Sequence, residues 1–139
     1  MVAVTADRLR AIPLFSTLSE TELEVTAGHF TERDVAPGAC LTVEGASGYC
    51  FFVIEHGTAE VEQDGKIINT LGDGDYFGEM AIVSGERRSA TVRAVSRLDL
   101  LVLFGTEFRL LERDLPSVAE KIVETMRRRS AGAPSPQAG

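Results

Sequence analysis

The sequence predicts a mainly β fold, an eight-stranded sandwich or barrel with helices at both ends of the chain. Short apolar or alternating runs fill residues 31–104, and glycine interrupts them at close intervals. The chain has 13 glycines and 5 prolines, which suits a fold rich in tight turns. Outside this region apolar residues follow a helical spacing. We therefore expect an N-terminal helical segment over 1–30, the barrel over 31–104, helices over 105–129 and a disordered tail over 130–139.

Two features define the N-terminal helices. Pro13 interrupts an apolar patch, so a first helix should end near Ala11. Ser19 and Glu22 have the spacing of a capping box, in which the hydroxyl accepts from the amide of the glutamate and the carboxylate reaches back. A second helix is therefore expected over residues 20–29.

Within the barrel region, the pair Asp64-Gly65 is the clearest turn, because it supplies the positive φ that a two-residue type I′ hairpin needs. In the strand before it, alternation places Val61 inward and the flanking glutamates in water. The expected strands are 32–35, 40–43, 50–55, 59–63, 66–71, 75–77, 90–94 and 98–104.

The C-terminal part returns to a helical pattern. Thr106 can cap a short helix that runs to about Glu112, and Pro116 suits the first position of a second helix. The second helix carries one apolar stripe, formed by Leu115, Ala119, Ile122 and Met126. We expect this stripe to pack on the barrel.

Composition and charge exclude several classes of protein. With 139 residues, 44% hydrophobic and 25% charged, the chain has the composition of one globular domain. A net charge of −7 argues against a nucleic-acid binder, although a local cluster of cations can still hold a small anion. No run reaches the ~20 apolar residues of a membrane span, and the first ten residues lack an apolar segment, so we expect no secretory signal. The two cysteines lack the spacing of a zinc site or a disulfide framework, so we expect a reduced, cytoplasmic protein.

The segment over residues 78–85 has the features of an anion-binding site. It has room for one or two helical turns between two strands, and it begins and ends with glycine. Free amides at the start of such a turn attract an anion, and Arg87 and Arg88 follow on a loop that can fold back to the same point. Glu79 makes sense beside these amides if it accepts a hydrogen bond from a hydroxyl of the same ligand, such as a ribose.

The runs Phe77-Gly78-Glu79 and Arg88-Ser89-Ala90-Thr91-Val92 resemble the phosphate-binding cassette of the cyclic nucleotide-binding domain family. The resemblance covers residues 10–129, and it implies a jelly-roll β-barrel with the cassette at 77–92 and a C-terminal lid helix. It further implies that the protein is a receptor module for a cyclic nucleotide, with no cofactor, no metal and no catalysis of its own.

The resemblance implies a role for each cassette residue. Glu79 would accept a hydrogen bond from the ribose 2′-hydroxyl, and Arg88 would pair with the exocyclic phosphate oxygens. The other implied ligand-binding residues supply amide donors or space: Gly78, Met80, Ala81, Ser89 and Ala90. In the family the last helix closes over the base, which makes Ile122, Val123 and Met126 the possible base lid.

Ser89 bears on the choice of ligand. In the resembled family a hydroxyl directly after the cassette arginine can favour cGMP. The bacterial cAMP receptors that this sequence resembles also carry serine there, where it serves the phosphate. We therefore expect cAMP as the ligand, with cGMP as the alternative.

Three other interpretations remain. A metal enzyme of the cupin type needs several histidines, and the chain has only His29 and His56. A degenerate domain would keep the fold as a protein-interaction module, although both Glu79 and Arg88 are retained. A regulator similar to the bacterial catabolite activator protein would continue into a DNA-binding domain, and here the last helix is expected to end near Arg129. The chain would then be the N-terminal sensor piece of a longer regulator. We expect no direct DNA or membrane binding, and a homodimer or an effector protein contacting the C-terminal helix.

Overall fold

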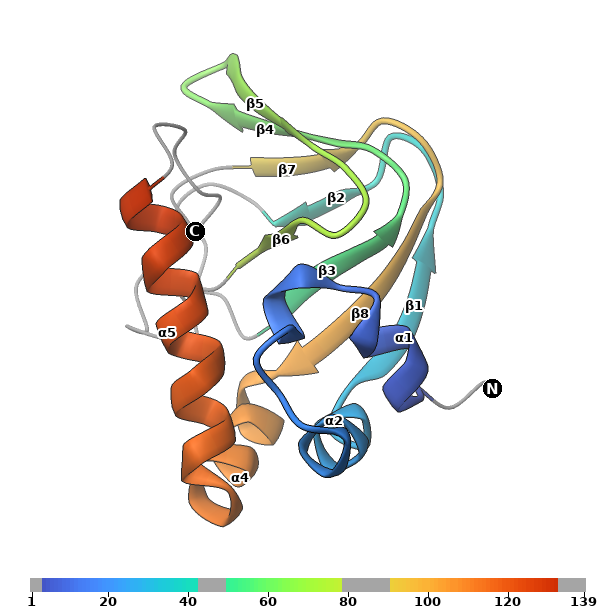
Figure 1. Ribbon diagram of the computed structural model, residues 1–139. Coiled ribbons are helices and arrows are strands. Elements are labelled where there is room, and N and C mark those ends of the chain that lie inside the picture. Colours follow the sequence, from blue (N-terminus) through green and yellow to red (C-terminus); the bar gives the residue numbers. More distant parts are fainter. Residues whose placement is uncertain (1–3, 43–49, 79–90, 133–139) are drawn as a thin grey trace.

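The computed structural model describes residues 4–42, 50–78 and 91–132 of the chain. It contains two antiparallel four-stranded sheets that face one another, with helices against one side (Figure 1). One sheet has the order β1-β8-β3-β6 and the other has the order β2-β7-β4-β5. The strands are β1 (Thr31–Val35), β2 (Cys40–Thr42), β3 (Cys50–His56), β4 (Ala59–Gln63), β5 (Lys66–Leu71), β6 (Tyr76–Phe77), β7 (Thr91–Ala94) and β8 (Leu98–Phe104). The predicted mainly β fold with flanking helices is thus confirmed.

The β4–β5 hairpin shows why the strand prediction succeeded. Asp64 has φ 53° and Gly65 has φ 76°, which are the two positive values that a type I′ turn requires. Val61 is fully buried, as the alternation predicted, while the adjacent Glu60 and Glu62 are half-buried rather than fully solvated.

The helices are α1 (Ala6–Arg10), the 3₁₀ turn η1 (Pro13–Phe15), α2 (Glu20–Ala27), α4 (Gly105–Asp114) and α5 (Pro116–Gly132). The capping box at the start of α2 is present, with the Glu22 amide donating to Ser19 Oγ at 3.2 Å and the Ser19 amide donating to Glu22 Oε1 at 2.9 Å. Helix α1 ends before Ala11, as predicted from Pro13.

Four helix ends differ from the prediction, and one of them is the end of α4 at Asp114, two residues past Glu112. Helix α2 stops at Ala27, two residues early, with Gly28 as its C-cap. Helix α4 begins at Gly105 with Phe104 as its N-cap, so Thr106 lies inside the helix and does not cap it. Helix α5 continues three residues past Arg129, to Gly132, because Ser130 and Ala131 are compatible with a helix and no proline or glycine intervenes.

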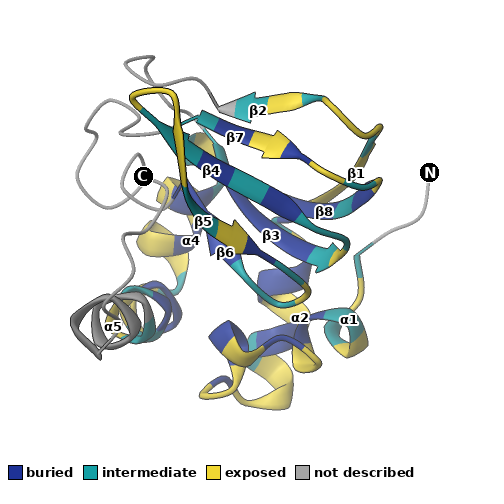
Figure 2. Cartoon of the chain, turned by 90° about the horizontal axis from the view of Figure 1, so that it is seen from above, coloured by how far each residue is buried: buried dark blue, intermediate teal, exposed yellow. Residues whose placement is uncertain are grey.

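Strands β3 and β8 separate two hydrophobic clusters. Successive residues of a strand point to opposite faces, and both faces of these strands are covered. On β3, Phe51 and Val53 belong to the cluster shared with the helices, whereas Phe52 and Ile54 belong to the cluster between the sheets. This is why residues 51–54 are all buried (Figure 2). The barrel and the helical layer are therefore packed as one unit through these two strands.

Charged contacts also join the helical layer to the barrel. The Arg8 guanidinium of α1 donates to both carboxylate oxygens of Glu55, at 2.8 and 2.6 Å, and lies 2.8 Å from Glu32 Oε2. This hydrogen bonding lowers the pKa of Glu55 below its ordinary value. A further contact joins two helices of the layer to each other: His29 Nδ1, just after α2, lies 3.0 Å from Glu107 Oε1 of α4. Among the described residues, no helix has the length and apolar character of a membrane span.

Candidate functional site

The cassette motif begins on strand β6, the edge strand of the sheet with the order β1-β8-β3-β6. Phe77 pairs with Phe52 of β3 and is fully buried, and the two rings stack with centroids 4.8 Å apart. Gly78 follows, buried and with φ 85°, a backbone conformation that L side chains rarely adopt. The glycine is therefore needed where the chain leaves the strand. The barrel core fixes the point at which the motif starts.

The motif ends on strand β7. Val92 is fully buried between the sheets and pairs with Val61 of β4. The ends of β6 and β7 that border residues 79–90 lie on the side of the barrel along which α5 runs (Figure 1). Buried aromatic or β-branched side chains thus fix the chain on both sides of residues 79–90. Both of these points lie on the side of the barrel along which α5 runs.

Of the predicted cassette ligand-binding residues, the structure places Gly78. The others lie outside the described residues: Glu79, Met80, Ala81, Arg88, Ser89 and Ala90. The short helical turn predicted over residues 78–85 lies outside them too, except for Gly78. These residue roles stay predictions.

Two of the three expected lid residues can be placed. Ile122 is 1% exposed and belongs to the hydrophobic cluster that joins the helices to β3 and β8, so in this structure it is a packing residue. Val123 is half-buried and packs at the edge of the same cluster. The side chain of Met126 lies outside the described residues. The buried part of the α5 stripe therefore belongs to the cluster that α5 shares with the N-terminal helices, α4, β3 and β8.

An ion pair between α2 and α5 was not predicted from the sequence. Lys121 Nζ donates to Glu22 Oε1 and Oε2 at 2.9 and 3.1 Å. The Ser19 amide and Lys121 together hold the pKa of Glu22 below its ordinary value. The capping-box pattern did identify Glu22, but no local signal could connect it to a lysine 99 positions later.

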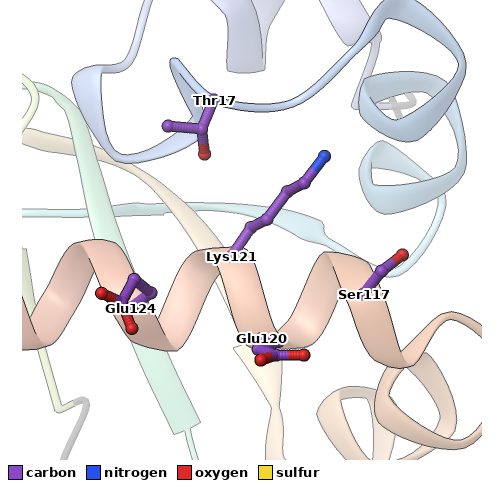
Figure 3. A pocket seen from close by; sticks show the side chains of 5 residues that line it. All are labelled: Thr17, Ser117, Glu120, Lys121 and Glu124. Carbon is purple, nitrogen blue, oxygen red and sulfur yellow. The ribbon is translucent and has the colours of Figure 1, made fainter.

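A hollow of about 320 Å³ lies between α5 and the connection from η1 to α2. Its lining residues are Thr17, Ser117, Glu120, Lys121 and Glu124. Figure 3 shows Lys121 extending from α5 toward the N-terminal helices, whereas Glu120 and Glu124 stay along the helix. The single lysine of the lining is already paired with Glu22, and the other charged lining residues are the carboxylates Glu120 and Glu124. An anionic phosphate does not suit it.

A second hollow on α5, of about 330 Å³, is also lined by carboxylate side chains. It is lined by Glu112, Pro116, Ala119, Glu120, Val123 and Glu124. Within residues 4–42, 50–78 and 91–132, no group of three or more His, Cys, Asp or Glu side chains has the arrangement of a metal site.

Comparison with known proteins gives a consistent result. Residues 32–114 match the family model of the cyclic nucleotide-binding domain. The chain is 36% identical over 125 residues to a cyclic nucleotide-gated potassium channel of Rhizobium etli, covering 89% of this chain and 35% of the channel. It is 36% identical over 105 residues to a cAMP-dependent protein kinase regulatory subunit of Yarrowia lipolytica, covering 74% of this chain and 28% of that protein. The chain thus spans about a third of the length of these relatives.

Solved structures agree. The catabolite activator protein of Thermus thermophilus superposes with a TM-score of 0.75 at 29% identity, covering 86% of this chain and 58% of that one. The resemblance predicted from the cassette is therefore confirmed.

Proposed function

We propose that this chain, which belongs to the cyclic nucleotide-binding domain family, is a receptor module that binds cAMP and responds to it through helix α5. The proposal rests on the position of the Phe77-Gly78-Glu79 run, which begins at the end of strand β6. A buried strand ends at a glycine of positive φ, and Glu79 follows at once, with Arg88 later in the same connection. The alternatives are a fold retained as an interaction module and the sensor piece of a longer regulator.

The two charged cassette residues would bind different parts of the nucleotide. Arg88 would neutralise the cyclic phosphate, since a guanidinium donates two parallel hydrogen bonds to an oxyanion. Glu79 would accept from the ribose 2′-hydroxyl. The net charge of −7 makes such a cation-lined site a local exception on an acidic chain.

The choice between cAMP and cGMP is part of the proposal. Ser89 follows Arg88, and its hydroxyl can serve either the phosphate or a guanine. The name of the Yarrowia relative, a cAMP-dependent regulatory subunit, supports cAMP. Calorimetric titration with both nucleotides in one buffer tests this. We expect tighter binding of cAMP, and tenfold tighter binding of cGMP would overturn the choice. No binding of either nucleotide would favour the interaction module.

Replacement of the cassette arginine tests the site itself. Removing one partner of a desolvated charge pair costs about 2–5 kcal/mol, so Arg88→Ala should weaken cAMP binding by roughly two to three decades. Arg88→Lys should recover only part, because an ammonium cannot bind two oxygens in parallel. Glu79→Gln should cost less, and the variant should discriminate little against 2′-deoxy-cAMP. Parent-like binding by both Arg88→Ala and Glu79→Gln would show that the cassette assignment is wrong.

Helix α5 is the proposed responding element. A ligand shifts a helix only by its differential affinity for two positions of that helix. Contact of the base with Val123 or Met126 would supply this difference, and Ile122 would join them only by leaving its cluster. Amide exchange over residues 115–127, with and without cAMP, measures the response. Unchanged exchange at saturating cAMP would refute the lid while leaving the binding site intact. A homodimer or an effector protein contacting α5 is the proposed recipient of the signal.

A further inference from the structure

We propose that Asn69 keeps the edge of strand β5 from pairing with the same strand of a second copy of this chain. This edge belongs to the sheet that lies away from the helical layer (Figure 1). The proposed effect is on self-association, and it is independent of nucleotide binding.

Among the edge strands that the structure describes, β5 is the one most open to the addition of another strand. Strands β2 and β6 have only three and two residues. Strand β1 carries three successive charges, Glu32, Arg33 and Asp34, which disfavour pairing. Strand β5 has six residues, its stretch 67–70 is uncharged, and Ile67 is 57% exposed. An exposed edge of this kind can act as a template for another strand.

The side chain of Asn69 occupies a backbone donor that strand addition would need. The Thr70 amide donates to Asn69 Oδ1 at 2.9 Å. Thr70 stands opposite Glu60 of β4, yet its amide hydrogen is used by the side chain rather than by that strand. In an antiparallel sheet alternate residues of an edge strand direct their amides away from the neighbouring strand. The Thr70 amide is therefore a donor of the open edge, and Asn69 satisfies it within β5 itself.

A β-bulge adds to this protection of the edge. Val61 pairs with Asn69 and Glu62 pairs with Ile67, so Ile68 is the extra residue on β5. A bulge bends its strand and increases the local twist, which makes the edge a poorer match for a regular strand. The bulge and the Asn69 contact thus lie next to each other on the same edge.

The partner that fits the open edge is a second copy of β5. An antiparallel pair of identical strands is self-complementary about a two-fold axis, so each copy supplies the donors and acceptors that the other needs. In that arrangement the start of one strand faces the end of the other, which keeps the two Lys66 charges apart. Each copy uses its β5 edge once, so the association stops at two copies.

Four variants separate the freed amide from the apolar character of the strand. Asn69→Val and Asn69→Ala both remove the acceptor of the Thr70 amide. Thr70→Val adds an apolar side chain at an exposed position of the same edge but keeps the Asn69 contact, so it is the matched control. The double variant Asn69→Val/Ile67→Lys places a charge on the freed edge, which disfavours pairing.

Sedimentation velocity over roughly a hundredfold range of protein concentration, without nucleotide, measures the average mass of each variant. We expect the mass of Asn69→Val to rise with concentration toward twice that of the parent chain. Asn69→Ala should show a smaller rise, because alanine is less suited to a strand, and it decides the question if Asn69→Val does not fold. Thr70→Val and the double variant should keep the mass of the parent at every concentration.

Three results would overturn the inference. The first is an unchanged mass for the folded Asn69 variants, and the second is an equal rise for Thr70→Val. The third is association that grows beyond two copies or persists in the double variant, because pairing through β5 allows neither.

Discussion

The barrel and the helical layer of this protein are held together by different forces. The hydrophobic cluster between the two sheets includes the stacked rings of Phe52 and Phe77, which lie on the neighbouring strands β3 and β6. On the helical side of β3 and β8, apolar packing is supplemented by two charged contacts: Arg8 of α1 bridges to Glu55 of β3, and Lys121 of α5 bridges to Glu22 of α2. Apolar burial does not respond to a change in charge or pH, whereas an ion pair does. We therefore expect the attachment of the helical layer to depend more on charge and pH than the contact between the two sheets.

The largest loss of stability is expected on β8, where two adjacent leucines each face a different hydrophobic cluster. Replacing them one at a time tests whether the barrel and the helical layer can be destabilised separately. Leu100 faces the space between the sheets and Leu101 faces the helices, and both are fully buried. Each Leu→Ala change should cost about 2–5 kcal/mol of unfolding free energy, measured by urea denaturation. Leu101→Ala should also speed amide exchange in α5, and Leu100→Ala should not. If amide exchange in α5 is equally fast in the two variants, the barrel and the helical layer cannot be destabilised separately.

A smaller effect is expected where α1 meets the barrel. Arg8→Met keeps much of the apolar stem but leaves Glu55 and Glu32 without this cation. Charge-assisted hydrogen bonds of this kind contribute about 1–3 kcal/mol, so the variant should lose about that much unfolding free energy. Arg10→Met is the control, since Arg10 pairs with Asp7 and Glu20 at the exposed surface. Equal losses in the two variants would mean that the Arg8 bridge adds nothing beyond a surface pair.

The smallest effect is a dependence of stability on pH. Hydrogen bonding to Arg8 lowers the pKa of Glu55, and hydrogen bonding to the Ser19 amide and Lys121 lowers the pKa of Glu22. A carboxyl whose folded pKa is depressed contributes stability above its unfolded pKa, and that contribution is lost as pH falls through the folded value. We expect a loss that begins near the ordinary glutamate pKa of 4.5, at about 1 kcal/mol or less for each group.

The comparison between variants isolates this effect. Urea denaturation at a series of acidic pH values should give a shallower decline for Glu55→Gln than for the parent chain, because glutamine does not titrate. A parallel decline in the two proteins would rule out Glu55 as a source of the acid sensitivity.

The local features of the fold were determined by the sequence itself. The type I′ turn at Asp64-Gly65, the capping box at Ser19 and Glu22, and the end of α1 before Pro13 all follow from short-range stereochemistry. The alternation around Val61 predicted its buried face in the same way. The cassette residues were predicted from their pattern, and of the predicted ligand-binding residues the structure places Gly78, which is buried and has a positive φ.

The tertiary structure alone decided how the helices sit on the barrel. Arg8 and Glu55 are 47 positions apart, and Lys121 and Glu22 are 99 apart. Charged residues are common on the surface of any chain, so no sequence pattern selects which cation meets which carboxylate. Likewise, the apolar stripe of α5 indicated that Ile122 packs inward or covers a ligand, and only the fold showed that it belongs to the cluster that joins the helices to β3 and β8. Local stereochemistry acts within a few residues of the chain, whereas these pairings depend on distant segments that folding brings together.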